Sequence, residues 1–245
     1  MGAVVSHIDY RRGRSPDALA DLQDGCAACV LTDPPYGTGK AGANYGRRRE
    51  GRVTSIANDV DLSELAATAP LIARVLAADG TVLVFCAPQQ RRHVEALLEG
   101  AGLSPLHSLP WDKGAPGISY RVRYAYEDVV LAAHPGYDPW EARETLIVPV
   151  RHPRVQETEH PNEKPVGLLR IYTRWACPSG GLIVDPFAGI ASSAVAAHAE
   201  GCDWIGAEMD EQWWGIAERR IADALERPHP DLTQYGLFTE TKEIA

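Results

Sequence analysis

Four residues that follow a short apolar run combine hydrogen-bond acceptors with an aromatic ring. Residues 29–31 (CVL) predict the end of a buried strand, because a short apolar run bounded by turn-forming residues is typical of one. Asp33-Pro34-Pro35-Tyr36, here called the DPPY corner, comes next. Proline fixes its own φ and keeps the preceding residue extended, so the Asp33 carboxylate and the Pro34 carbonyl point in fixed directions. The corner suits a planar ligand that carries an amino group, and a surface turn is the alternative.

A second group of residues with chemical potential lies in the C-terminal part. Residues 182–195 (LIVDPFAGIASSAV) read as a strand, a turn of small residues and a helix, which brings backbone N–H groups close to a ligand. The next strand ends at Glu208, about 20 residues after the turn, where an acid commonly binds ribose hydroxyls. The turn itself, Gly189-Ile190-Ala191, lacks the full glycine pattern of a pyrophosphate site. An adenosyl ligand is therefore favoured over a dinucleotide.

Positive charge is concentrated in one short stretch. The net charge of −9 argues against a protein that coats nucleic acid generally, because phosphate binding needs positive charge. Residues 45–52 (YGRRREGR) nevertheless hold Arg47, Arg48, Arg49 and Arg52, here called the arginine cluster. We expect this cluster to meet a polyanion, with a solvated loop as the alternative. Two further arginines are second candidates for a phosphate-facing surface: Arg121 and Arg123.

Cysteines and terminal segments indicate a reducing compartment. The five cysteines are odd in number and lie in apolar surroundings, as expected of a cytoplasmic protein. Cys26 and Cys29 form a C-x-x-C without a second pair or a histidine cluster, so we expect neither zinc nor redox chemistry there. His152 and His160 lack metal-ligand spacing. No apolar segment approaches the roughly 20 residues of a membrane helix, and the N-terminus lacks a signal core. We expect no metal and no membrane association.

Strand-like and helix-like segments alternate along the chain. This pattern predicts one α/β domain over residues 1–245, with a mostly parallel sheet covered by helices on both faces. Pro70 is expected to divide or bend one helix. The expected strands are 29–31, 81–87, 127–134, 181–185 and 203–208. The expected helices are 17–25, 62–80, 88–102, 164–177, 190–201 and 210–226.

Five sequence blocks, taken in order, resemble one enzyme family. They are TDPPYG, WDKGAPGISYRVRYAYEDVVLA, HPNEKPVGLL, DPFAG and GAEMDEQWW, and they span the chain from about residue 13 to residue 226. In this combination the chain resembles the permuted, beta-group DNA amino-methyltransferases, which use S-adenosylmethionine. The resemblance implies a Rossmann-like seven-stranded sheet in which the catalytic half precedes the cofactor half. A short insertion at about 134–160 is then the candidate target-recognition segment.

The resemblance also implies roles for individual residues. Asp33 and the Pro34 carbonyl would accept hydrogen bonds from the amino group of a flipped base, within the rigid corner that Pro35 completes, and Tyr36 would stack on the base. The implied cofactor site consists of Asp185, Pro186, Phe187, Ala188, Gly189, Glu208, Asn162, Lys164 and Pro165.

Two positions depart from the family pattern. The usual Gly-Ser-Gly of the cofactor turn is Gly189-Ile190-Ala191 here. An N-terminal Gly-Asp that helps to bind the cofactor's adenine in the family is Gly13-Arg14 here, with Asp9 or Asp17 as substitutes.

Methylation of an aromatic amine requires positioning and electrostatic stabilisation rather than a strong base or a metal. The amine must also leave the duplex to be reached. In the family that the chain resembles, an aspartate in the first position of DPPY goes more often with adenine. The resemblance therefore implies a DNA methyltransferase acting on adenine N6, with cytosine N4 as the alternative and a non-catalytic DNA- or cofactor-binding relative as a third, disfavoured class. The partner is double-stranded DNA. The sequence leaves open the target site, a homodimer and a restriction endonuclease partner.

Overall fold

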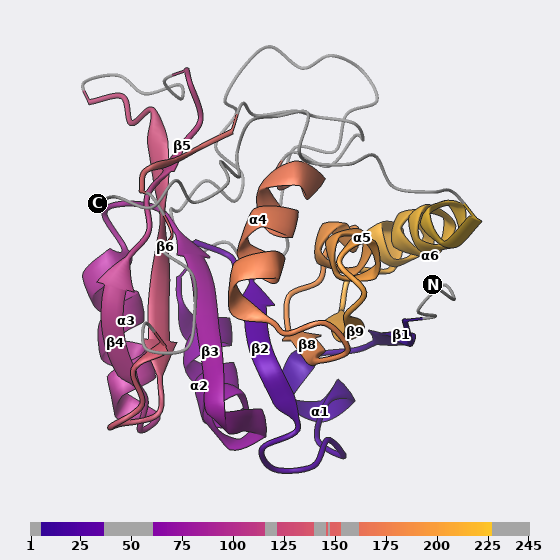
Figure 1. Ribbon diagram of the computed structural model, residues 1–245, viewed down its shortest axis with the longest axis horizontal. Coiled ribbons are helices and arrows are strands. Elements are labelled where there is room, and N and C mark those ends of the chain that lie inside the picture. The colour runs from indigo at the N-terminus through magenta and orange to yellow at the C-terminus, as the bar shows by residue number, and fades with distance from the viewer. Residues whose placement is uncertain are drawn as a thin grey trace, which may run out of the picture.

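The computed structural model describes residues 6–36, 61–115, 122–139, 146, 148–152 and 162–226. The arginine cluster and Arg121 lie outside these residues. Within them, the strands form one nine-stranded sheet in the order β1-β9-β8-β2-β3-β6-β5-β7, and β4 pairs with β6 (Figure 1). The strands are β1 Ile8–Arg12, β2 Ala27–Thr32, β3 Leu76–Cys86, β4 Ser104–Ser108, β5 Trp111–Asp112, β6 Tyr126–Ala133, β7 Val150–Arg151, β8 Leu182–Asp185 and β9 Asp203–Glu208.

Five neighbouring strands of the sheet, β1, β9, β8, β2 and β3, run parallel. Strand β6 is antiparallel to both β3 and β4. Strands β5 and β7 have only two residues each and extend one edge of the sheet. The other strands form its body. The early strand β2 lies next to the late strand β8, so the two halves of the chain meet in the middle of the sheet. The predicted α/β fold is thereby confirmed.

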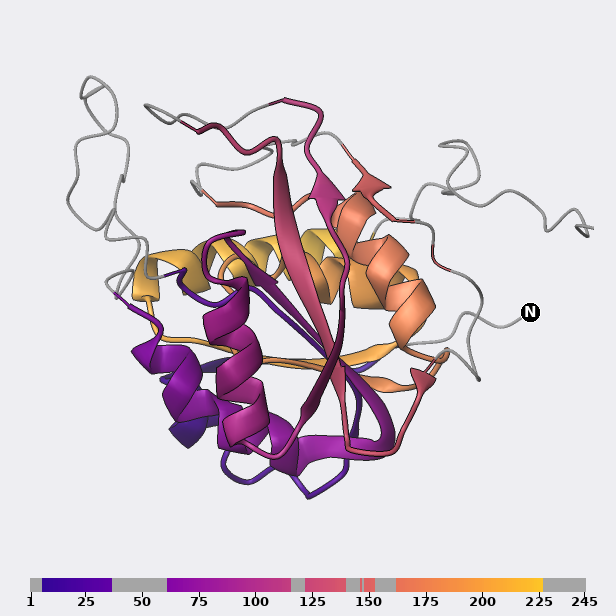
Figure 2. The same cartoon turned by 90° about the vertical axis from the view of Figure 1, so that its left-hand side faces the viewer.

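Helices cover both faces of the sheet (Figure 2). The first three helices lie on one face and the last three on the other, as their mutual contacts and Figure 2 agree. The helices are α1 Ser15–Ala18, α2 Ser63–Val75, α3 Arg91–Gly100, α4 Val166–Ala176, α5 Ser192–Ala199 and α6 Glu211–Glu226. None of the helices in the described part of the chain is long and apolar enough to cross a membrane.

Alternate residues of the central strands supply two separate cores. Leu83 and Phe85 of β3 pack with residues of α4 and α5, whereas Val82 and Val84 pack with residues of α2 and α3. Successive side chains of a strand point to opposite faces, so a continuous apolar run such as residues 82–85 is what a strand buried on both faces requires. These cores fix the strands whose ends carry the polar residues described below.

Several element boundaries differ from the prediction. Residues 76–80, predicted as the end of a helix, begin β3, and Leu76 pairs with Ala27 of β2. Gly80 fits this pairing because a Cβ there would lie 3.0 Å from the Ala27 carbonyl oxygen. Helix α2 is continuous through Pro70. The helix predicted at 17–25 is the short α1, which starts and ends earlier.

Four strands were not predicted at all. Strand β1 (IDYRR) is mostly polar, β4 contains Pro105, and β5 and β7 are too short to show a pattern. Strand β7 falls within the predicted insertion at 134–160 and pairs in parallel with β5.

Candidate functional site

The two groups of residues singled out in the sequence meet at one edge of the sheet. Strands β2, β8 and β9 run parallel, so their carboxyl ends, which lead into Asp33, Asp185 and Glu208, lie side by side. Ligands of open α/β sheets bind at this edge. A single cavity is lined by the DPPY corner and by residues 185–190 of the cofactor turn. The structure thus brings the DPPY corner and the residues of the cofactor turn to one cavity.

Asp185 organises the turn that follows β8. Its Oδ1 accepts hydrogen bonds from the Thr32 hydroxyl at 2.6 Å and from the Phe187 N–H at 3.1 Å. Its Oδ2 accepts a bond from the Ser193 hydroxyl of α5. Burial raises the pKa of Asp185 to about 6, although these three hydrogen bonds oppose the rise. Asp185 therefore ties β2, the turn and α5 together.

Glu208 lines the same cavity from the end of β9. Its Oε2 accepts the Gly189 N–H at 2.9 Å and its Oε1 accepts the Asp210 N–H at 2.7 Å. Burial raises the pKa of Glu208 above its ordinary value. A carboxylate has about four acceptor sites, so this oriented group can still accept a hydrogen bond from a diol.

The cofactor turn has a backbone that normally favours glycine. Gly189 has φ +51°, and Ala191, the buried residue before α5, has φ +58°. The left-handed region is uncommon for residues with a Cβ, so the third position of the turn retains the shape of a glycine turn although its residue is alanine.

At the DPPY corner, the two oxygens of Asp33 differ in their contacts. Oδ2 accepts a hydrogen bond from the Lys164 ammonium at 2.5 Å. Oδ1 is buried and has no hydrogen-bond partner among the described residues. Burial raises the pKa of Asp33 against the opposing effect of the Lys164 charge. One acceptor atom of Asp33, a residue that lines the cavity, thus lacks a hydrogen-bond partner among the described residues, whereas a buried polar atom normally has one.

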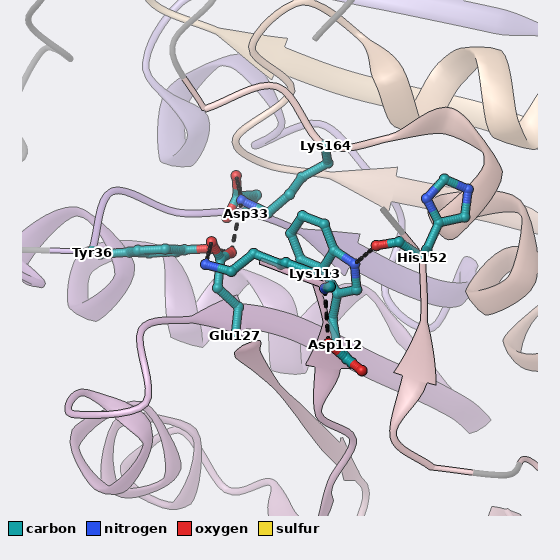
Figure 3. A network of polar contacts seen from close by, with 9 residues as sticks. Asp33, Tyr36, Asp112, Lys113, Glu127, His152 and Lys164 are labelled. Atoms are coloured by element: carbon teal, nitrogen blue, oxygen red, sulfur yellow. Dashed lines mark hydrogen bonds and ion pairs between the residues drawn. The ribbon is translucent and has the colours of Figure 1, made fainter. Parts of the chain in front are cut away.

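Tyr36 is fixed by a carboxylate that the sequence did not identify as functional. Its hydroxyl donates a 2.7 Å hydrogen bond to Glu127 Oε2, at the start of β6 (Figure 3). Lys113 donates to Glu127 Oε1 at 3.2 Å, and Lys164 lies 3.4 Å from Oε2. Burial alone would raise the pKa of Glu127, but the Lys164 and Lys113 charges outweigh it and lower the pKa to about 2. Sequence patterns assigned Glu127 only to a strand.

The remaining predicted site residues fall in three groups. Asn162 and Lys164 line the cavity, while Pro165 precedes α4 and is buried outside the lining. Arg123 is exposed and is not a lining residue. Arg47, Arg48, Arg49, Arg52 and Arg121 lie outside the described residues.

An ion pair lines the cavity at Gly13-Arg14, the position where the family usually has Gly-Asp. Neither Asp9 nor Asp17, the suggested substitutes, is a lining residue, whereas Arg14 and Glu64 both are. The Arg14 Nε lies 2.9 Å from Glu64 Oε2. Glu64 belongs to the first turn of α2, and no sequence signal connected it with Arg14.

Side chains of the metal-ligating types do not form a cluster in the described part of the chain. No group of three or more histidine, cysteine, aspartate or glutamate side chains there could hold a metal ion. Cys26 and Cys29 are not joined by a disulfide bond.

The described strands thus form a mostly parallel sheet with an acid-lined cavity at its carboxyl edge. Comparison with protein families is more specific, since a family model described as DNA methylase (N6_N4_Mtase) matches residues 27–219. The chain belongs to this N6/N4 DNA methylase family.

Individual relatives agree with this assignment. An Escherichia coli (strain K12) protein named as a methylase, YubD, is 29% identical over 213 residues, covering 87% of this chain and 89% of the relative. The DNA adenine methyltransferase YhdJ of the same organism is 22% identical and covers 84% of this chain and 80% of the relative.

Solved structures of similar proteins show the same fold. The M1.HpyAVI–SAM complex has a TM-score of 0.65 at 17% identity and covers 87% of this chain and 99% of that one. The cytosine-N4-specific PvuII DNA methyltransferase has a TM-score of 0.68 at 16% identity and covers 91% of this chain and 93% of that one.

Proposed function

We propose that this protein transfers a methyl group from S-adenosylmethionine to the exocyclic N6 amino group of a flipped adenine in double-stranded DNA. One observation carries the proposal: the buried Oδ1 of Asp33 has no hydrogen-bond partner among the described residues, and Asp33 lines the same cavity as Glu208. An amino group donates two N–H bonds, and this oxygen supplies an acceptor for one of them.

The residues of the cavity fit the proposed cofactor. Glu208 is oriented by two backbone N–H groups and has lone pairs left for the ribose hydroxyls. Asp185 orders the turn at which the cofactor would lie. When bound, S-adenosylmethionine supplies an electrophilic methyl group on a sulfonium sulfur.

The DPPY corner performs the remaining chemistry. An aromatic amine is a weak nucleophile because its lone pair is delocalised into the ring. By accepting N–H bonds, Asp33 Oδ1 and the Pro34 carbonyl favour a more tetrahedral nitrogen, and the Asp33 charge stabilises the positive charge that develops there. The nitrogen gains a methyl group and must lose one proton, which Asp33 can accept because burial raises its pKa. Tyr36 holds the extruded base by stacking.

The choice of adenine is supported by the aspartate of the DPPY corner, which in the family it resembles goes more often with adenine, and by the name of the relative YhdJ. Cytosine N4 is the alternative, because the same acceptors would serve its amino group and the structurally similar PvuII enzyme is cytosine-N4-specific. Incubation with labelled S-adenosylmethionine and unmethylated plasmid DNA, followed by mass spectrometry of the nucleosides, decides between them. N6-methyladenine supports the proposal, N4-methylcytosine supports the alternative, and no methylated nucleoside contradicts both.

Two substitutions should separate chemistry from cofactor binding. Asp33→Ala should lower methyl transfer by at least about 100-fold, as removal of a transition-state contact typically does, and leave the calorimetric S-adenosylmethionine affinity within a few fold. Glu208→Gln should instead weaken that affinity, because it removes charge-assisted hydrogen bonds. Asp79→Ala, at an exposed position of β3, is the control for loss of an aspartate. Retained turnover in Asp33→Ala would remove this residue from the mechanism.

A further inference from the structure

Four charged side chains meet at the DPPY corner: one of them, Asp33, belongs to the corner, and the other three come from other parts of the chain. Asp33 follows β2, Lys113 follows β5, Glu127 lies in β6 and Lys164 precedes α4 (Figure 3). Lys164 is the most buried of the four, with a side chain that is 7% exposed. Two carboxylates and two ammonium groups balance in charge, which is the condition under which such groups are tolerated away from water.

Lys164 is shared between two carboxylates. Its Nζ lies 2.5 Å from Asp33 Oδ2 and 3.4 Å from Glu127 Oε2. An ammonium group has three donors and no acceptor, so Glu127 can use one donor while Asp33 uses another. If Asp33 were its sole partner, Lys164 would neutralise the carboxylate that is proposed to stabilise positive charge. Glu127 offsets that effect, and Lys113 balances Glu127 in turn.

Glu127 also determines where the ring of Tyr36 lies. The Tyr36 hydroxyl donates to the same Oε2 that faces Lys164. Lys164 Nζ lies 5.1 Å from the centre of the Tyr36 ring and 5.2 Å from that of Phe85, within the range of a cation–π contact. A single carboxylate thus orients both the partner of the acceptor and the ring proposed to stack on the base.

We propose that Glu127 is a positioning residue for methyl transfer, which holds the Lys164 ammonium beside Oδ2 of Asp33 and the Tyr36 ring in place so that Oδ1 is left to accept a hydrogen bond from the amino group. This inference rests on the proposed function. Glu127 acts through Asp33 and Tyr36, and it is absent from the residues that line the cavity.

Glu127→Gln tests this role because glutamine keeps the size and removes the charge. We expect kcat to fall on the order of 10- to 100-fold, as misplacement of catalytic groups does, with the KM and affinity for S-adenosylmethionine within about twofold. Tyr36, Lys164 and Glu127 face Asp33, and Asp185 lies near enough to interact with it electrostatically. Because the Glu127 charge raises the pKa of Asp33, its removal should move the acidic limb of the kcat–pH profile to lower pH.

Two control variants separate the contributions. Tyr36→Phe removes only the hydroxyl that reaches Glu127, so its acidic limb should not move to lower pH. Glu99→Gln, exposed on α3, removes a glutamate charge that is not part of the network and should match the wild type. If Glu127→Gln does not fold, the charge-balanced double variant Lys113→Gln/Glu127→Gln replaces it.

A wild type that yields no methylated nucleoside would refute the proposed function rather than the role of Glu127. Titration of the Asp33 carboxylate by ¹³C NMR then tests that role without turnover. A lower Asp33 pKa in Glu127→Gln supports it, and an unchanged pKa overturns it. With an active wild type, a kcat in Glu127→Gln within twofold of wild type, or a loss of kcat with an unmoved acidic limb, overturns the inference.

Discussion

Burial disfavours the ionised form of the Asp185 carboxylate more strongly than its hydrogen bonds favour it. Its carboxylate is buried, accepts three hydrogen bonds and has a pKa raised to about 6 from an ordinary 3.8. Below pH 3.8 it is protonated in both the folded and the unfolded chain. Between pH 3.8 and about 6 the folded chain binds the additional proton, so the free energy of unfolding falls as pH rises through this window.

Asp185→Asn should remove this pH dependence, since the amide does not ionise. Relative to the variant, the wild type should lose up to about 3 kcal/mol of stability between pH 4 and pH 7. Denaturant unfolding of both proteins at several pH values measures the difference, with Asp79→Asn as an exposed control. A difference that stays constant across pH would show that Asp185 does not ionise within this window.

At the scale of elements, one glycine in β9 connects the core to the cofactor turn. Trp204 lies two residues before Gly206 on the same face of the strand, and its indole donates a 3.1 Å hydrogen bond to the Ser193 hydroxyl. Ser193 in turn donates to Asp185. A Cβ at Gly206 would lie 2.3 Å from the Trp204 ring and 3.0 Å from the Ala188 Cβ. Only glycine leaves room for the indole beside the turn.

Gly206→Ala should therefore destabilise the protein by about 1–3 kcal/mol, as overpacking of a core does. It should also weaken cofactor binding, because Trp204 and Ala188 must shift. Gly215→Ala in α6 is a matched control, since a Cβ there meets no atom within 4 Å. That change should stabilise the helix by roughly 0.5–1 kcal/mol. Thermal unfolding and calorimetry compare the two, and equal effects of both substitutions would rule out crowding at Gly206.

Elements with a local sequence signal could be predicted, whereas elements whose position depends on tertiary pairing could not. The DPPY corner and the turn after β8 are local, since apolar runs, prolines and glycines report directly on neighbouring backbone. The parallel order of β2, β8 and β9 follows from strands that alternate with helices. Strand β1 carries four polar or aromatic residues out of five, and its place depends on pairing with β9.

The contacts around Glu127 could not be predicted from the sequence. They depend on antiparallel pairing of β6 with β3 and on the position of the segment before α4, neither of which leaves a periodic signal. The pairing of Arg14 with Glu64 is likewise a product of tertiary packing between α2 and the start of α1.

Across the whole molecule, an acidic chain must still hold a polyanion if the proposed function is correct. The net charge is −9, and the densest positive charge in the sequence is the arginine cluster, twelve residues or more beyond the corner residue Pro35. If these side chains meet phosphates, each ion pair releases condensed counterions, and the slope of log affinity against log salt reports their number.

Neutralising Arg47, Arg48, Arg49 and Arg52 together should weaken duplex binding and reduce the salt slope by roughly 0.9 for each phosphate that is no longer neutralised. The S-adenosylmethionine affinity should not change, because that cofactor carries no phosphate. Binding titrations at several salt concentrations compare the quadruple variant with wild type and with Arg92→Gln, an exposed arginine of α3 that serves as control. Equal slopes of log affinity against log salt for the wild type and the quadruple variant would mean that the arginine cluster does not contact DNA phosphates. In that case the exposed Arg123, beside the strand that carries Glu127, becomes the next residue to test for contact with DNA.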